Sequence, residues 1–143
     1  MTHRAESILN AVNTALTGLA TTGANVQRFR AWPVTTLPAL TILKGGDQTV
    51  TGDSSMDVIT REMIITIRAS VKGTGVLETS LNQIAAEIFA ALKADYTLGL
   101  SYVYDLELLS ESEPAIDEQD EPVAYQDSMY QITYEHSETS AEA

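Results

Sequence analysis

The side chains that could do chemistry in this sequence are mainly carboxylates, and many of them lie close together. Eight acidic residues fall between positions 105 and 121, and no lysine or arginine follows position 93. They are Asp105, Glu107, Glu111, Glu113, Asp117, Glu118, Asp120 and Glu121. Carboxylates at this density could hold a metal ion, perform acid–base catalysis, dock a basic partner or keep DNA away.

The spacing of these carboxylates disfavours the metal and catalytic interpretations. The four carboxylates from Asp117 to Glu121 could supply oxygen ligands to calcium, but they lack the alternating spacing and central glycine of an EF-hand loop. Acid–base catalysis needs an apolar pocket that shifts one pKa, whereas Pro114 and Pro122 indicate a polar hairpin tip. We therefore interpret the stretch as a solvated loop, without a metal or another cofactor.

Histidine and cysteine chemistry is equally limited. The chain has no cysteine, which excludes disulfides and thiolate metal sites. Its two histidines, His3 and His136, lie near the two ends in polar surroundings, and we expect both to be exposed to solvent. A catalytic zinc site or a Ser-His-acid triad would have to use one of them. The sequence therefore predicts a protein that is not an enzyme.

Length and composition indicate one acidic domain with a core. The chain has 143 residues, an apolar fraction of 44% and a net charge of -12. All eight basic residues lie in positions 1–93, and 94–143 hold thirteen carboxylates. Such a surface repels a phosphate backbone. No apolar run has membrane-spanning length, and polar residues interrupt the region where a signal peptide would need apolar ones, so we expect a soluble protein.

The elements that must position these residues can be read from the apolar spacing. Gaps of three and four predict amphipathic helices over 2–19, with Thr2 as the N-cap, and over 76–95. Period-two alternation and turn signals predict five strands: 25–32, 38–46, 56–72, 100–109 and 123–136. The predicted core contains Leu9, Leu16, Ile65, Ile67, Leu81 and Ile88.

These elements predict an α+β fold in a single domain. Two apolar helical stripes and one-sided strands fit an antiparallel (mixed) sheet with both helices packed on one face. The last two strands should pair as a hairpin whose tip is the acidic stretch. The domain should cover residues 1–136, and we expect the polar residues 137–143 to be a disordered tail.

Three segments and the order of the elements resemble a known family. The sequence contains "PALTIL" (38–43), "REMIITIRASV" (61–71) and a closing "MYQITYEH" (129–136), after an amphipathic N-terminal helix. A second helix and a hairpin with an acidic tip separate the last two segments. Over residues 3–136 this arrangement resembles the tail terminator proteins of long-tailed bacteriophages, the lambda type in particular.

The resemblance implies a structural virion protein with no cofactor and no catalysis. Tail terminators form a hexameric ring at the head-proximal end of the tail tube, stop tube polymerisation and present the surface that joins the head. The implied partners are other copies of the chain, the major tail tube protein and a head-completion or connector protein. Phage DNA would pass through the lumen without specific binding. Assembly would occur in the bacterial host cytoplasm, without a membrane.

Within that family, the eight carboxylates would have one of two roles. Facing the lumen they would let DNA slide past, and facing the tail or the head they would dock a basic partner. We favour docking, because a proline-bounded tip should project from the sheet. The alternative functions are another neck or head-completion protein, an acidic DNA mimic that binds a basic host protein, and, last, a small hydrolase.

Overall fold

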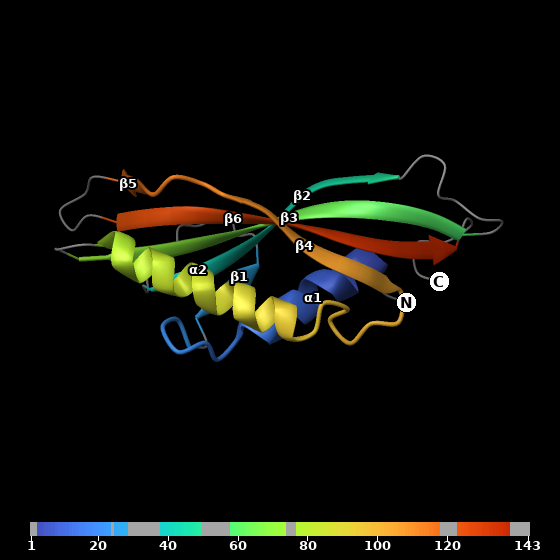
Figure 1. Ribbon diagram of the computed structural model, residues 1–143, viewed down its shortest axis with the longest axis horizontal. Coiled ribbons are helices and arrows are strands. Elements are labelled where there is room, and N and C mark those ends of the chain that lie inside the picture. The colour runs from blue at the N-terminus through green and yellow to red at the C-terminus, as the bar shows by residue number, and fades with distance from the viewer. Residues whose placement is uncertain are drawn as a thin grey trace.

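Within the described residues, six strands form one sheet and two helices lie on the same side of it (Figure 1). The computed structural model describes residues 3–23, 25–28, 38–49, 58–73, 77–117 and 123–137. The predicted fold class is confirmed: the chain is a single α+β domain with a mixed sheet. Of the expected tail, 137–143, Ser137 is the last residue of a paired strand, which differs from the prediction, and 138–143 lie outside the described residues.

The two helices form where the apolar stripes predicted them. Helix α1 spans Arg4–Leu16 and helix α2 spans Leu77–Ala94. The N-cap of α1 is His3, whose Nδ1 accepts a hydrogen bond of 3.0 Å from the backbone N–H of Ala5. The sequence assigned this role to Thr2, which lies outside the described residues. An exposed histidine thus caps the start of the helix by satisfying one of its free backbone donors.

The strands follow the predicted order with one addition. They are β1 (Val26–Arg28), β2 (Ala39–Thr49), β3 (Val58–Lys72), β4 (Val103–Glu111), β5 (Ala115–Asp117) and β6 (Val123–Ser137). The spatial order is β1-β2-β3-β6-β4, and β5 also pairs with β6. Only the β1–β2 pair is parallel among the described strands. The long strands β3 and β6 pair over their whole length at the centre of the sheet.

Several strand boundaries differ from the prediction. Strand β4 was expected over 100–109 but spans Val103–Glu111, and β6 ends one residue later than predicted, at Ser137. The expected strand 25–32 is described only as far as Arg28. Strand β2 was expected to stop at Gly45 and Gly46, but it continues to Thr49 through a register shift between Lys44 and Asp47. That shift is a β-bulge, which adds one residue to β2 and lets the pairing with β3 resume beyond it.

The bulge depends on the absence of a side chain at Gly45. A Cβ placed there would lie 2.9 Å from the backbone carbonyl oxygen of Ile64, which is closer than real Cβ atoms approach. Beyond the bulge, Asp47 pairs with Met63, whose side chain is buried in the core. Because one extra residue reverses which face a strand residue occupies, the bulge turns Asp47 toward the helix-bearing face.

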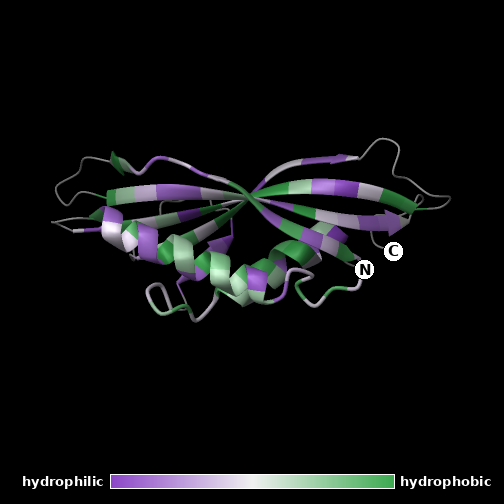
Figure 2. Ribbon diagram, viewed as in Figure 1, coloured by the Kyte–Doolittle hydropathy of each residue, from purple (hydrophilic) through white to green (hydrophobic). Residues whose placement is uncertain are grey.

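The core lies between the sheet and the two helices, as the apolar spacing predicts. Figure 2 shows hydrophobic and hydrophilic residues alternating along the strands. The six predicted core residues are all buried, with exposed fractions of 3% or less: Leu9, Leu16, Ile65, Ile67, Leu81 and Ile88. Burying a leucine or isoleucine side chain stabilises the fold by about 1.5–3 kcal/mol, so this layer is the main source of stability.

Candidate functional site

The predicted acidic residues lie along one edge of the sheet. Strand β4 pairs with β6 and has no second partner among the described strands, so it forms that edge. Asp105, Glu107 and Glu111 are exposed on β4, and Glu113 is exposed just after it. Asp117 ends β5. The other three predicted residues, Glu118, Asp120 and Glu121, lie outside the described residues.

The first part of the acidic stretch does not project from the sheet. Ser112 binds β6 at two points: its N–H donates to the carbonyl of Asp127 (2.7 Å) and its carbonyl accepts from Nε2 of Gln126 (2.8 Å). Residues 115–117 then pair with β6 as strand β5. The expectation of a projecting tip is therefore wrong for residues 112–117, because backbone pairing holds them against the sheet.

The exposed carboxylates form a line and not a cluster. Successive residues of a strand advance by about 3.3 Å, so the carboxylates from Asp105 to Glu113 are spread over roughly 25 Å. Within the described residues, no group of three or more histidine, aspartate or glutamate side chains could hold a metal ion. Among the described residues, no ion pair includes Glu107, Glu111 or Glu113. The edge therefore presents negative charge to solvent over an extended length.

The acidic edge also influences a buried tyrosine. Tyr130 on β6 is fully buried, and its hydroxyl has no hydrogen-bond partner among the described residues. Burial, and to a lesser degree the negative charge of Glu111, raise the pKa of Tyr130 to about 12. The neutral phenol is therefore the stable form in the folded protein.

A second polar group, which sequence reasoning missed, lies at the end of the sheet where β3 begins and β6 ends. We call it the Asp47 cluster, and it consists of Asp47 on β2, Arg61 on β3, and Tyr134 and His136 on β6. The Tyr134 hydroxyl donates a hydrogen bond of 2.7 Å to Oδ2 of Asp47. Nε of Arg61 lies 3.1 Å from Oδ1 of the same carboxylate, without the alignment of a hydrogen bond. The Asp47 side chain is only 6% exposed, so the bulge places a carboxylate where it needs these partners.

The position of His136 corrects the sequence prediction. His136 is 7% exposed and therefore buried, and its ring centroid lies 6.5 Å from that of Tyr134. It was expected in a polar, solvated end of the chain. Strand β6 continues to Ser137, and the period of two places residue 136 on the same buried face as residue 134. The composition around His136 gave no sign of this.

The Asp47 cluster holds three strands together and activates no nucleophile. Burial first, and then the hydrogen bond to Asp47, raise the pKa of Tyr134, so the phenol remains a donor. The negative charge of its partner, the Asp47 carboxylate, is balanced by the guanidinium of Arg61. A neutral phenol and a paired carboxylate fix the register of β2, β3 and β6. The signal in the sequence was the Gly-Gly-Asp at 45–47, which lies at the predicted end of the strand 38–46.

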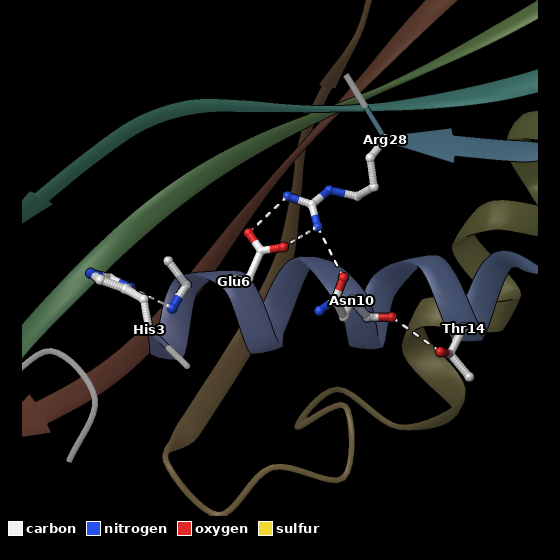
Figure 3. Close-up of polar contacts among 6 residues, drawn as sticks. His3, Glu6, Asn10, Thr14 and Arg28 are labelled. Carbon is white, nitrogen blue, oxygen red and sulfur yellow. Dashed lines mark hydrogen bonds and ion pairs between the residues drawn. The ribbon is translucent and has the colours of Figure 1, made fainter. Parts of the chain in front are cut away.

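A third polar group ties β1 to α1 (Figure 3). The guanidinium of Arg28 donates to both carboxylate oxygens of Glu6, at 2.9 and 3.2 Å, and to Oδ1 of Asn10 at 3.0 Å. The hydrogen bond from Arg28 is the main reason why the pKa of Glu6 is lowered. Arg28 is thus engaged within the chain.

Comparisons with known proteins give a similar fold and no family. No protein-family model matches the sequence, and no curated protein matches it. Among solved structures, the fold is similar to a chain in a structure described as "Virion of native gene transfer agent (GTA) particle". The TM-score is 0.48 and the identity 15%, over 93% of this chain and 88% of that chain. A likeness of this size carries no functional argument, so the function has to be inferred from the residues.

No helix in the described part of the chain is long and apolar enough to cross a membrane.

Proposed function

We propose that the chain is a structural virion protein of a phage-type tail, and more specifically a tail terminator. In this role it forms a six-membered ring at the head-proximal end of the tail tube, stops tube growth and presents the surface that joins the head. The proposal needs no cofactor and no catalytic residue. It is supported by the family resemblance of "PALTIL", "REMIITIRASV" and "MYQITYEH", which lie on β2, β3 and β6. These strands are adjacent in the sheet.

The observation that carries the proposal is the one-sided cover of the sheet. Both helices lie on the same face (Figure 1), and within the described residues no element covers the opposite one. That face carries the half-buried side chains of Ile64 and Met129 beside the ion pair of Arg68 with Asp127. A small domain with an uncovered sheet face and a free edge is suited to an assembly, where repeated contacts between copies close a ring.

The acidic edge restricts how the copies can be arranged. Each copy carries a net charge of -12, so a ring must keep the edges formed by β4 away from one another. The edge also exposes two apolar side chains, Leu109 (45%) and Ile116 (63%). Apolar groups beside carboxylates are suited to docking a basic partner, whereas a sliding DNA surface needs charge alone. We therefore assign the edge to docking at the tail or the head.

The partners in this proposal are other copies of the chain, a tail tube protein and a head-completion or connector protein. DNA passes through the ring without specific binding. Native mass spectrometry of the chain, alone and with assembled tail tubes, tests the ring. Six copies are expected, at least on tubes. A chain that stays monomeric and never binds tubes would refute the proposal.

The docking role of the edge has its own test, which is an in vitro assay of head–tail joining. The variant Glu107→Gln with Glu111→Gln should join poorly, and wild-type joining should weaken as salt rises. The control, Glu62→Gln with Glu78→Gln, changes the net charge by the same amount away from β4. Normal joining by the Glu107→Gln with Glu111→Gln variant, with slower DNA passage, would indicate that the edge lines the lumen. Equal joining and equal DNA passage by both variants would remove its functional role.

A second candidate function is mimicry of DNA by an acidic protein. It is favoured by one observation, the line of exposed carboxylates from Asp105 to Glu113 along the sheet edge. A mimic would act as a monomer or dimer and would bind a basic DNA-binding protein of the host. The measurement of mass that tests the ring also distinguishes these two functions.

A further inference from the structure

At Leu106 of the edge strand β4, both backbone hydrogen-bonding groups, the N–H and the C=O, bind side chains. The N–H of Leu106 donates to Oδ1 of Asp105 at 2.9 Å. Its carbonyl oxygen accepts a hydrogen bond of 2.7 Å from Nζ of Lys93, which lies in the last turn of α2. Leu106 sits opposite Ile132 of β6. Because the N–H and C=O of Leu106 bind these side chains, both backbone groups point away from β6, toward the free edge of the sheet.

The position of Leu106 explains why its backbone groups need partners. In an antiparallel pair, alternate residues direct both their N–H and C=O groups toward the neighbouring strand or away from it. A residue of the second kind on an edge strand offers an N–H and a C=O to any strand that approaches. At Leu106 a carboxylate and an ammonium group already hold them. Another strand could pair here only after both contacts were broken.

The shape of β4 on either side of Leu106 works in the same direction. The register with β6 shifts between Val103 and Asp105, and again between Leu108 and Ser110. Bulges of this kind bend an edge strand and interrupt the regular row of donors and acceptors that a second strand requires. The regular part of β4 is therefore short and has Leu106 near its middle.

We propose that Lys93 and Asp105 form an edge clamp on Leu106 that closes β4 to strand addition. Other proteins, and other copies of this chain, then meet this edge through side chains and not through a shared sheet. The inference does not rest on the proposed function, because it requires only the contacts at Leu106. It also gives Lys93 a specific role: the last basic residue of the sequence lies beside the acidic edge and binds a backbone carbonyl there.

The clamp can be removed without changing the net charge. Lys93→Met keeps an apolar stem and loses the donor, and Asp105→Ala loses the acceptor, so the double variant still carries -12. The control is Lys72→Met with Glu107→Ala, which also conserves the net charge and replaces an exposed β4 carboxylate beside the clamp. Circular dichroism establishes that both variants are folded.

Sedimentation velocity over a range of concentrations, with thioflavin T fluorescence, measures self-association. The clamp variant should form dimers or larger species, with higher thioflavin T signal, at concentrations about tenfold lower than the wild type and the control. Comparison with the control separates this effect from ring formation, which all three proteins share. A folded clamp variant that associates no more than the control would overturn the proposal.

Hydrogen exchange on the wild-type protein tests the clamp without any substitution. By the alternation along β4, the amides of Leu106 and Leu108 face the same free edge. The amide of Leu106 should exchange about tenfold more slowly than that of Leu108, because Asp105 holds it. Equal exchange rates at the two amides would show that the clamp does not form in solution and would refute the inference.

Discussion

The hydrogen bond between Tyr134 and Asp47 can be tested by a double-mutant cycle. The perturbations are Tyr134→Phe, which deletes only the hydroxyl, and Asp47→Ala, which deletes the carboxylate. The two atoms are 2.7 Å apart and join β6 to β2 across β3. Neither group has ready access to water, since Tyr134 is fully buried and the Asp47 side chain is 6% exposed.

The expected magnitudes follow from burial and charge. A hydrogen bond to a charged group contributes about 1.5–3 kcal/mol, so Tyr134→Phe should lower the free energy of unfolding by that amount. Asp47→Ala should cost more, about 3–5 kcal/mol, because it also leaves Arg61 without its carboxylate. In the Asp47→Ala background, the phenol hydroxyl has no acceptor left to lose. The coupling between the two substitutions should therefore be about 1.5–3 kcal/mol.

Urea unfolding of the wild type, both single variants and the double variant gives this coupling. The matched control is the ion pair of Arg68 with Asp127, which joins β3 to β6 on the uncovered face at 2.8 Å. Arg68 is 42% exposed, so its cycle should give about 0.2–1 kcal/mol. Additive effects at Tyr134 and Asp47, or equal coupling in both cycles, would refute the argument that burial makes the Asp47 cluster strong.

Three further predictions concern the core, the bulge and pH. Ile67→Ala should lower the free energy of unfolding by about 2–5 kcal/mol in a thermal melt, and an unchanged melt would contradict its burial. Gly45→Ala should lower the free energy of unfolding by about 1–3 kcal/mol, because the new Cβ would meet the Ile64 carbonyl oxygen. The control is Gly46→Ala, whose Cβ would have no atom within 4 Å. Equal unfolding midpoints for the two variants would contradict the close approach at Gly45. The raised pKa of Tyr130, about 12 against an ordinary value of 10.0, means that the folded state keeps a proton which the unfolded state loses above about pH 10. Stability should be retained below that pH. Between pH 10 and 12, Tyr130 should contribute a fall of about 1.4 kcal/mol per unit, in addition to the fall that the raised pKa of Tyr134 produces. Tyr130→Phe should remove the Tyr130 contribution from the slope in urea titrations, and the same slope in both proteins would show that other groups alone are responsible.

Local apolar spacing determined much of the fold. The gaps of three and four in α1 and the period of two in β3 each depend on residues that are neighbours in sequence, so both elements could be predicted. The buried positions of Leu9 and Ile67 followed from the same patterns. The concentration of carboxylates after position 93 was also a property of the sequence alone, and their exposure on β4 agrees with it.

Contacts between distant segments decided the rest. A period of two identifies a buried face, but it does not say which strand lies beside which, or where a bulge reverses a side chain. The bulge at Gly45 depends on the carbonyl of Ile64 in another strand, and it alone brings Asp47 to Tyr134. His136 is buried because β6 continues far enough along β3.

The acidic edge shows the same division between sequence and tertiary structure. The sequence determined that carboxylates crowd this part of the chain and that no cation follows them. Only the tertiary structure placed β4 at the edge of the sheet and brought Lys93 from α2 onto the backbone of Leu106. The physical reason is that composition and period are local properties, whereas the free backbone groups of an edge strand exist only after the sheet has formed.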